Sequence, residues 1–200
     1  TLDERMSLLE KLIQILKENA EELKEKMMLE LGRSRFSVEE EWQLCLKFFE
    51  IVPHFCKENL KDHQDTDGSQ WIYVPVGKVL ISSNISNPVY SLLTSAIPPL
   101  IAGNSVCVVP SLSCLLSSSI ISSSFHQASF PHCSIQFVFG DFDVFRRLLL
   151  THTFDVISYT GNEENIEQVK KDASSSQNAR LVLNGAGKNA VYVTGSLTMT

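Results

Sequence analysis

The chain lacks the features that identify several classes of protein. Its five cysteines form no Cys-x-x-Cys pair, and no histidine stands at the spacing of a metal ligand, so no disulfide framework and no metal site are expected. No apolar run approaches the roughly 20 residues of a membrane helix. The first residues show no signal-peptide pattern. We therefore expect reduced thiols and a cytoplasmic location.

Clustered positive charge is also missing. The formal net charge is −6, and lysine and arginine form no patch that would bind nucleic-acid phosphates. We expect no nucleic-acid partner. The 200 residues, 44% of them apolar, suit one domain, or one large and one small unit, with a buried core.

The first thirty residues have the pattern of an amphipathic helix. Apolar side chains recur every three or four positions over residues 2–31, with glutamate and lysine between them. Thr1 and Glu4 are spaced as a capping box, and Gly32 is typical of a helix end. The pattern predicts one long helix that ends at Gly32.

A second capping box, Ser37 with Glu40, predicts another helix that runs to about Leu60. We expect residues 1–62 to form an N-terminal helical segment. Its charged side chains are typical of a solvated face, and binding of a protein partner is the alternative.

From residue 71 onward, short β-rich runs alternate with stretches of helical length. This alternation predicts βαβ units on a mostly parallel sheet, a doubly wound, Rossmann-like α/β fold. Ligands bind such sheets outside the carboxyl ends of the strands, so we expect a site in the loops that follow these runs. The runs are residues 71–74, 79–82, 106–109, 135–139, 156–159, 180–183 and 190–193.

Eight serines lie between residues 111 and 124. The apolar residues Leu115, Leu116, Ile120, Ile121 and Phe125 recur at helical spacing in and just beyond this stretch. The spacing predicts an amphipathic helix with a serine face, and a low-complexity or phosphorylated segment is the alternative.

Seven motifs, in order along the chain, resemble those of the aldehyde dehydrogenase superfamily. The resemblance covers essentially all 200 residues and implies two leading helices followed by a NAD(P)-binding-like domain over residues 70–200, without the catalytic and oligomerisation parts of that fold. The motifs are Pro75-Val-Gly77 (P-x-G), Pro88 (P-W-N-x-P), Pro98, Gly103-Asn104 (G-N-x-V), Phe130-Pro131 (F-P-x-G), His152 to Gly161 (H-P-x-V-D-x-V-x-F-T-G-S) and Leu181 to Val193 (L-E-L-G-G-K-N-P).

The resemblance implies catalytic positions that this chain fills with other residues. Asn184 stands where the family has its general-base glutamate, and an amide has no titratable proton acceptor near neutral pH. Ser86, or Asn87 beside it, stands where the family's asparagine donates to the developing oxyanion. The family's nucleophilic cysteine lies well beyond the general-base segment, and none of the five cysteines here occupies that position.

The implied cofactor contacts are altered as well. Val109 and Leu112 replace the lysine and glutamate that bind the adenosine ribose, and Phe142 replaces a small residue near the adenine. Weak or absent binding of NAD or NADP is therefore expected. The residues that could still contact a cofactor are Ser82, Ser83, Asn84, Gly140, Thr160, Gly161, Asn162 and Gly185.

Two functions follow from this resemblance. One is NAD(P)-dependent oxidoreduction of an aldehyde or acyl thioester, if the full-length protein supplies a catalytic cysteine. The other is an inactive family member or fragment with a structural or partner-binding role. Asn84-Ile-Ser-Asn87-Pro88, Val109 and Gly185-Ala-Gly187 resemble the CoA-acylating aldehyde dehydrogenases and acyl-CoA reductases. An active protein would take a small-molecule substrate, and a homo-oligomer and a protein partner are both compatible with the resemblance.

Overall fold

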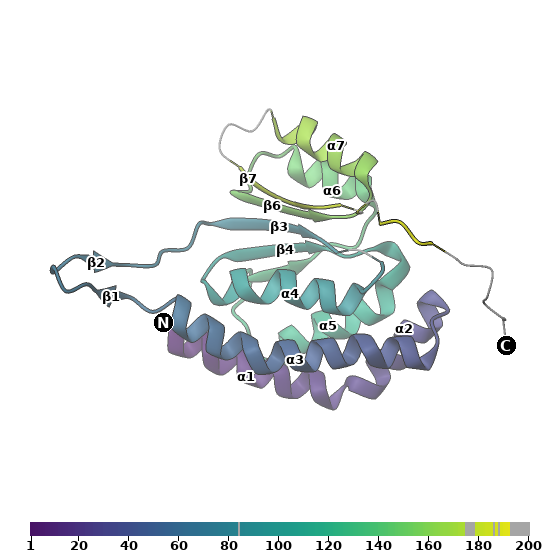
Figure 1. Cartoon of the computed structure of the whole chain (residues 1–200), viewed down its shortest axis with the longest axis horizontal. Helices are drawn as coiled ribbons and strands as arrows, with labels where there is room; N and C mark the ends of the chain where they lie inside the picture. The colour runs from purple at the N-terminus through teal and green to yellow at the C-terminus, as the bar shows by residue number, and fades with distance from the viewer. Residues whose placement is uncertain (84, 175–178, 186, 188, 193–200) are drawn as a thin grey trace.

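The fold is built on a five-stranded parallel sheet with helices on both faces (Figure 1). The computed structural model describes residues 1–83, 85–174, 179–185, 187 and 189–192. The strand order β5-β4-β3-β6-β7 confirms the predicted doubly wound α/β fold. The strands are β3 (Lys78–Ser82), β4 (Ser105–Val109), β5 (Ile135–Phe137), β6 (Val156–Thr160) and β7 (Arg180–Asn184).

The strand order reverses between β3 and β6. The chain proceeds outward from β3 through β4 to β5, and then returns to place β6 on the other side of β3. Leu80 and Ile81 of the central strand β3 are fully buried, as expected for a strand covered on both faces. This reversal opens a crevice at the carboxyl ends of β3 and β6, where ligands bind in folds of this class.

Helices form layers on both sides of the sheet (Figure 1). α4 (Pro88–Ile101) and α5 (Leu115–Gln127) cover one face, and α6 (Phe142–Leu149) and α7 (Glu163–Ala173) cover the other. Three leading helices pack on α4 and α5 as a further layer. They are α1 (Leu2–Glu18), α2 (Ala20–Leu31) and α3 (Arg35–Asn59).

The predicted ends of the leading helical stretch are confirmed, but its continuity is not. Thr1 and Glu4 form the capping box, and Gly32 ends α2 with a φ of 62°. The prediction of one helix over residues 2–31 is wrong at Asn19, where a φ of −87° and a ψ of 7° separate α1 from α2. The hydrophobic pattern continues across this break because Leu16 and Leu23 face the same core.

The second predicted capping box, Ser37 with Glu40, is wrong. α3 begins at Arg35, and the hydroxyl of Ser34 caps it by accepting from the Ser37 backbone N at 3.2 Å. The Ser37 hydroxyl is instead bonded to Arg33, whose Nη2 donates to it at 2.9 Å. The guanidinium of Arg33, four residues earlier in the chain, therefore binds the side chain that the pattern assigns to the cap.

The serine-rich stretch is helical, as predicted, and Ile121 and Phe125 are buried as expected, but serines share the buried face. It comprises a short 3-10 helix, η1 (Leu112–Cys114), followed by α5. Ser117 and Ser124 are buried, whereas Leu116 is 45% exposed. Glu30 of α2 explains the burial of Ser117, because its carboxylate accepts from the backbone N and Oγ of Ser117 at 3.0 and 2.8 Å. Small serine side chains let α5 lie close to the leading helices.

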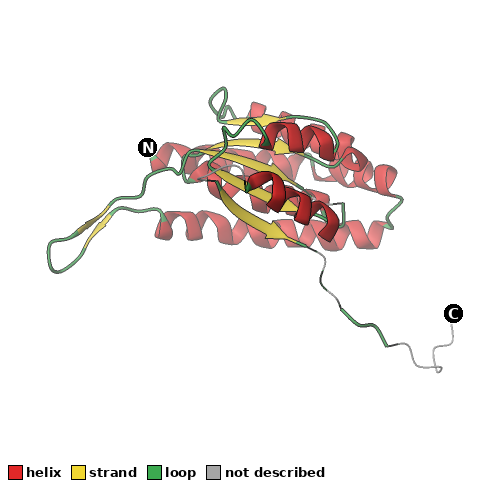
Figure 2. Ribbon diagram, turned by 90° about the horizontal axis from the view of Figure 1, so that it is seen from above, coloured by secondary structure: helices red, strands yellow, loops and turns green. Residues whose placement is uncertain are grey.

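Two predicted sheet strands are corrected. Residues 71–74 do not join the parallel sheet: β2 (Gln70–Trp71) pairs antiparallel with β1 (His63–Gln64) in a ribbon that projects from the body (Figure 2). The Trp71 Nε1 donates to Asp65 at 2.7 Å and helps to close this ribbon. Residues 190–192 form no strand, and residue 193 lies outside the described residues.

Candidate functional site

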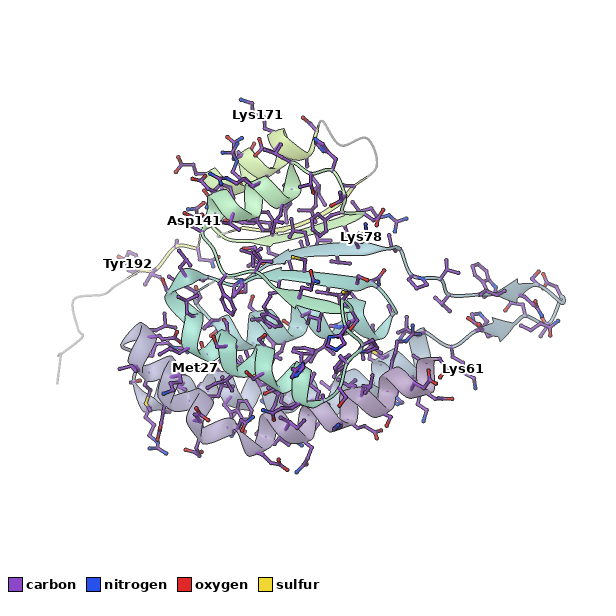
Figure 3. The ribbon with its side chains drawn as sticks, turned by 180° about the vertical axis from the view of Figure 1, so that it is seen from behind. Met27, Lys61, Lys78, Asp141, Lys171 and Tyr192 are labelled. Carbon is purple, nitrogen blue, oxygen red and sulfur yellow. The ribbon has the colours of Figure 1, made fainter. Side chains whose placement is uncertain are left out.

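A pocket of about 810 Å³ opens at the carboxyl ends of the strands, around the crevice between β3 and β6. Asp141, at the start of α6, marks this end of the sheet, and Lys78 marks the opposite end (Figure 3). The volume lies within the usual range for small-molecule sites. The pocket is therefore where the strand order places a ligand.

The pocket brings together most of the residues that the sequence singles out. Asn84 lies outside the described residues, and Asn87 is not among the lining residues but stands at the N-cap position of α4. The predicted residues that line it are Ser82, Ser83, Ser86, Val109, Leu112, Gly140, Phe142, Thr160, Gly161, Asn162, Asn184 and Gly185.

Glu41 of α3, which sequence reasoning missed, holds the loop between β3 and α4. Its side chain is fully buried, and one carboxylate oxygen accepts from the backbone N of Val89 at 2.9 Å and of Tyr90 at 3.0 Å. The other oxygen pairs with Arg33. Glu41 thus caps α4 from another helix and fixes the loop that carries Ser83 and Ser86. A glutamate beside Trp42 on the apolar face of α3 was the available signal.

Ser83 presents a buried hydroxyl to the pocket. The residue is 5% exposed, and its Oγ has no hydrogen-bond partner among the described residues. A buried hydroxyl without a partner costs about 1–3 kcal/mol, so such groups are rare unless something else satisfies them. The Ser83 Oγ is a hydrogen-bonding group available to a ligand.

Three aromatic rings form the apolar wall of the pocket. The ring centroid of Tyr159 lies 5.6 Å from that of Phe142 and 5.2 Å from that of Phe145, both in edge-to-face geometry. The Tyr159 hydroxyl accepts from Asn165 Nδ2 at 2.9 Å. Burial raises the pKa of Tyr159 despite this hydrogen bond, which acts in the opposite direction. The phenol is therefore protonated at neutral pH.

The turn from β6 into α7 is sterically tight. A Cβ atom on Gly161 would lie 2.6 Å from the hydroxyl oxygen of Tyr159, so a side chain there requires the aromatic wall to shift. Asn162 caps α7 by accepting from the Asn165 backbone N at 2.8 Å. A Cβ on Gly185 would lie 2.7 Å from a carboxylate oxygen of Glu163. The first turn of α7 thus places negative charge beside Gly185.

The described lining residues contain no lysine, arginine or cysteine. Asp141 is the lining carboxylate, and it caps α6 by accepting from the Val144 backbone N at 3.1 Å. Asn184 contributes an amide, and its backbone oxygen accepts from the Gly161 N at 3.1 Å. The described wall therefore offers neutral hydrogen-bonding groups and aromatic surface, without a thiol nucleophile.

All five cysteines are free thiols, and four of them are shielded from solvent. Burial, with the nearby charges of Glu30 and Glu41, raises the pKa of Cys114 to about 12. Burial also raises the pKa of Cys45 well above its ordinary value. These thiols are protonated at pH 8 and cannot attack as thiolates. Cys133 alone is exposed.

We expect Ellman's reagent at pH 8 to modify one thiol of the native protein quickly. Cys133→Ser should abolish this fast phase, because the raised pKa and burial of the other cysteines slow their reaction. Denaturation should then expose the remaining thiols. Stopped-flow absorbance measures the phases, and a second fast equivalent in the native protein would show that a shielded cysteine is reactive.

The sequence of the whole chain matches one protein family. The family model described as "Aldehyde dehydrogenase family" matches residues 1–199. The chain belongs to the aldehyde dehydrogenase family. This confirms the resemblance at the level of the family. Comparison with curated proteins finds no match.

Solved structures support the fold of this aldehyde dehydrogenase family member. Aldehyde dehydrogenase from Bartonella henselae has a TM-score of 0.88 and 21% identity, with 95% of this chain and 41% of that chain covered. NAD-dependent benzaldehyde dehydrogenase from Corynebacterium glutamicum has a TM-score of 0.82 and 20% identity, with 92% of this chain and 42% of that chain covered. Betaine aldehyde dehydrogenase from Staphylococcus aureus, in complex with NAD+, has a TM-score of 0.85 and 19% identity, with 94% of this chain and 38% of that chain covered. The chain spans about two fifths of the length of these structures.

Among the helices of the described residues, none is long and apolar enough to cross a membrane. Within the same residues, no three histidine, cysteine, aspartate or glutamate side chains gather as a metal site would require.

Proposed function

We propose that residues 1–200 form an aldehyde dehydrogenase-type ligand pocket without catalytic activity of its own. The observation that carries this proposal is that Asn184, which by the resemblance stands at the family's general-base position, lines the pocket. An amide cannot accept a proton near neutral pH. The described wall also lacks a thiol, so the thiolate attack on a carbonyl that the family uses cannot begin there. The free cysteines support a reducing, cytosolic compartment.

The residues present do not fit the adenosine half of NAD or NADP. Val109 and Leu112 offer no hydrogen bond to a ribose, and the Phe142 ring occupies the wall beside Tyr159. Arg146 of α6 is paired with Asp172 of α7, with Nε at 2.6 Å and Nη2 at 3.3 Å from the two carboxylate oxygens. This pair and the packed Phe145 join the two helices. We therefore propose that dinucleotide binding is weak or absent.

We expect the protein to form no NADH or NADPH from an aldehyde. It would be incubated with acetaldehyde or benzaldehyde and NAD+ or NADP+, with and without CoA, while absorbance at the reduced-nicotinamide band is followed. Asn184→Glu restores the carboxylate but not the thiol, so this variant should also match buffer. Sustained turnover by either protein, absent after heat denaturation, would overturn the proposal.

The second candidate is oxidoreduction of an aldehyde or acyl thioester by a longer protein that supplies a thiol from outside residues 1–200. It is favoured by the placement of Ser86 and Asn184, two hydrogen-bonding residues, in one pocket. The resemblance to the CoA-acylating branch stays a prediction within this candidate. Reading the coding sequence past Thr200 tests it: a cysteine in an apolar, glycine-flanked context supports the enzyme, and its absence excludes it.

A further inference from the structure

We propose that the pocket binds an uncharged aromatic molecule, with Ser83 as its hydrogen-bond anchor, rather than an anionic nucleotide. This inference rests on the proposed function, because it names the ligand class of the same noncatalytic pocket. It follows from three properties of the described wall: its aromatic surface, its lack of cations and its unsatisfied hydroxyl.

The aromatic surface gives a flat ring a place to bind. Phe142 and Phe145 lie with centroids 6.5 Å apart and nearly parallel, at 11°, and both meet the Tyr159 ring edge to face. Phe142 is only partly buried, so its ring can be covered further by a ligand. An added ring in such a cluster gains favourable ring–ring contacts beyond the effect of its buried area. Val109 and Leu112 extend this apolar wall.

The charges near the pocket disfavour an anion. Asp141 lines it, and the Glu163 carboxylate lies beside Gly185, while no lysine or arginine is among the described lining residues. The start of α7 would otherwise attract a phosphate through its backbone N–H groups. Glu163 and Glu164 in its first turn already complement that helix end. An added anion would therefore meet like charge without a counter-ion.

Ser83 supplies the second, independent indication of a ligand. More than nine tenths of the residue is buried, it lines the pocket, and its Oγ has no partner among the described residues. A hydroxyl can donate to an oxygen or accept from an N–H. A ligand with one polar group on an aromatic frame would satisfy this hydroxyl while its ring covers Phe142.

A matched pair of dyes separates charge from shape. N-phenylnaphthylamine is neutral and carries one N–H, and anilinonaphthalene sulfonate has the same rings with an added sulfonate. Fluorescence titration of the 200-residue protein should give a dissociation constant at least about fivefold lower for the neutral dye. Tighter binding of the sulfonate, or no binding of the neutral dye, would overturn the inference.

Pocket variants locate the binding. Ser83→Ala should weaken the neutral dye about fivefold, because it loses one hydrogen bond. Phe142→Lys should reverse the preference, since it replaces the ring with an ammonium group. Phe36→Ala is the control for exposed apolar surface, because Phe36 is 73% exposed on α3, and it should change nothing. If Phe36→Ala weakens the dye and the pocket variants do not, the site is elsewhere and the inference fails.

Competition with NAD+ separates this inference from the proposed function. NAD+ at millimolar concentration should leave the neutral dye bound, and displacement at micromolar concentration would refute the preference for an uncharged ligand. That result would not by itself restore catalysis, which the nicotinamide assay measures separately. Conversely, turnover in that assay would refute the proposed function whatever the dyes do.

Discussion

Glu41→Ala is expected to lower the free energy of unfolding by about 3–5 kcal/mol, the cost of breaking a buried ion pair. The substitution leaves Arg33 without its buried partner and removes the acceptor of the Val89 and Tyr90 backbone N–H groups. The Glu41 side chain is fully buried, and the Arg33 side chain is only 16% exposed, so water replaces the lost contacts poorly. The loop between β3 and α4 and the first turn of α4 should become more mobile, and ligand binding at Ser83 should weaken as a result.

Urea denaturation followed by tryptophan fluorescence measures this change, because buried Trp42 lies next to Glu41. Glu40→Ala is the matched control: the same residue type, one position away on α3, is exposed and should change stability by no more than about 0.5 kcal/mol. Equal effects of the two substitutions would show that the cap across helices contributes little.

Local chemistry explains which elements the sequence predicted correctly. Gly32 ends α2 because a left-handed residue is needed there, and the apolar run at residues 106–109 forms β4 because a strand covered on both faces needs one. The prediction that residues 71–74 belong to the parallel sheet was wrong because it depended on a distant partner. The strand that holds Trp71 pairs with His63 in a projecting ribbon, and a β-rich run alone does not reveal its partner.

The features of the candidate site also divide into those that the sequence predicts and those that it does not. The residues matched to family motifs, such as Gly161 and Asn184, meet in one pocket because they follow strands whose carboxyl ends adjoin. The sequence predicts Ser83 as a pocket residue, but it predicts neither the missing partner of the Ser83 hydroxyl nor the contact of Glu41 with the start of α4. Both depend on packing between segments far apart in the chain, and the spacing within either segment carries no record of that packing. By the resemblance, Phe142 replaces a small residue near the adenine, and the structure places its ring in the pocket wall.

Phe145→Ala is expected to lower the free energy of unfolding by about 3–5 kcal/mol, because it leaves a cavity between the sheet and α6. Phe145 is 1% exposed and loses its edge-to-face contact with Tyr159, 5.2 Å away. The same cavity opens into the pocket, so the Phe145→Ala variant should accept larger ligands than the unmodified protein does. Phe139→Ala is the matched control, since Phe139 is 44% exposed, and should cost less than about 1 kcal/mol. Urea denaturation compares the two, and a loss below about 1 kcal/mol for Phe145→Ala would mean that the aromatic wall is not part of the core that holds α6 on the sheet.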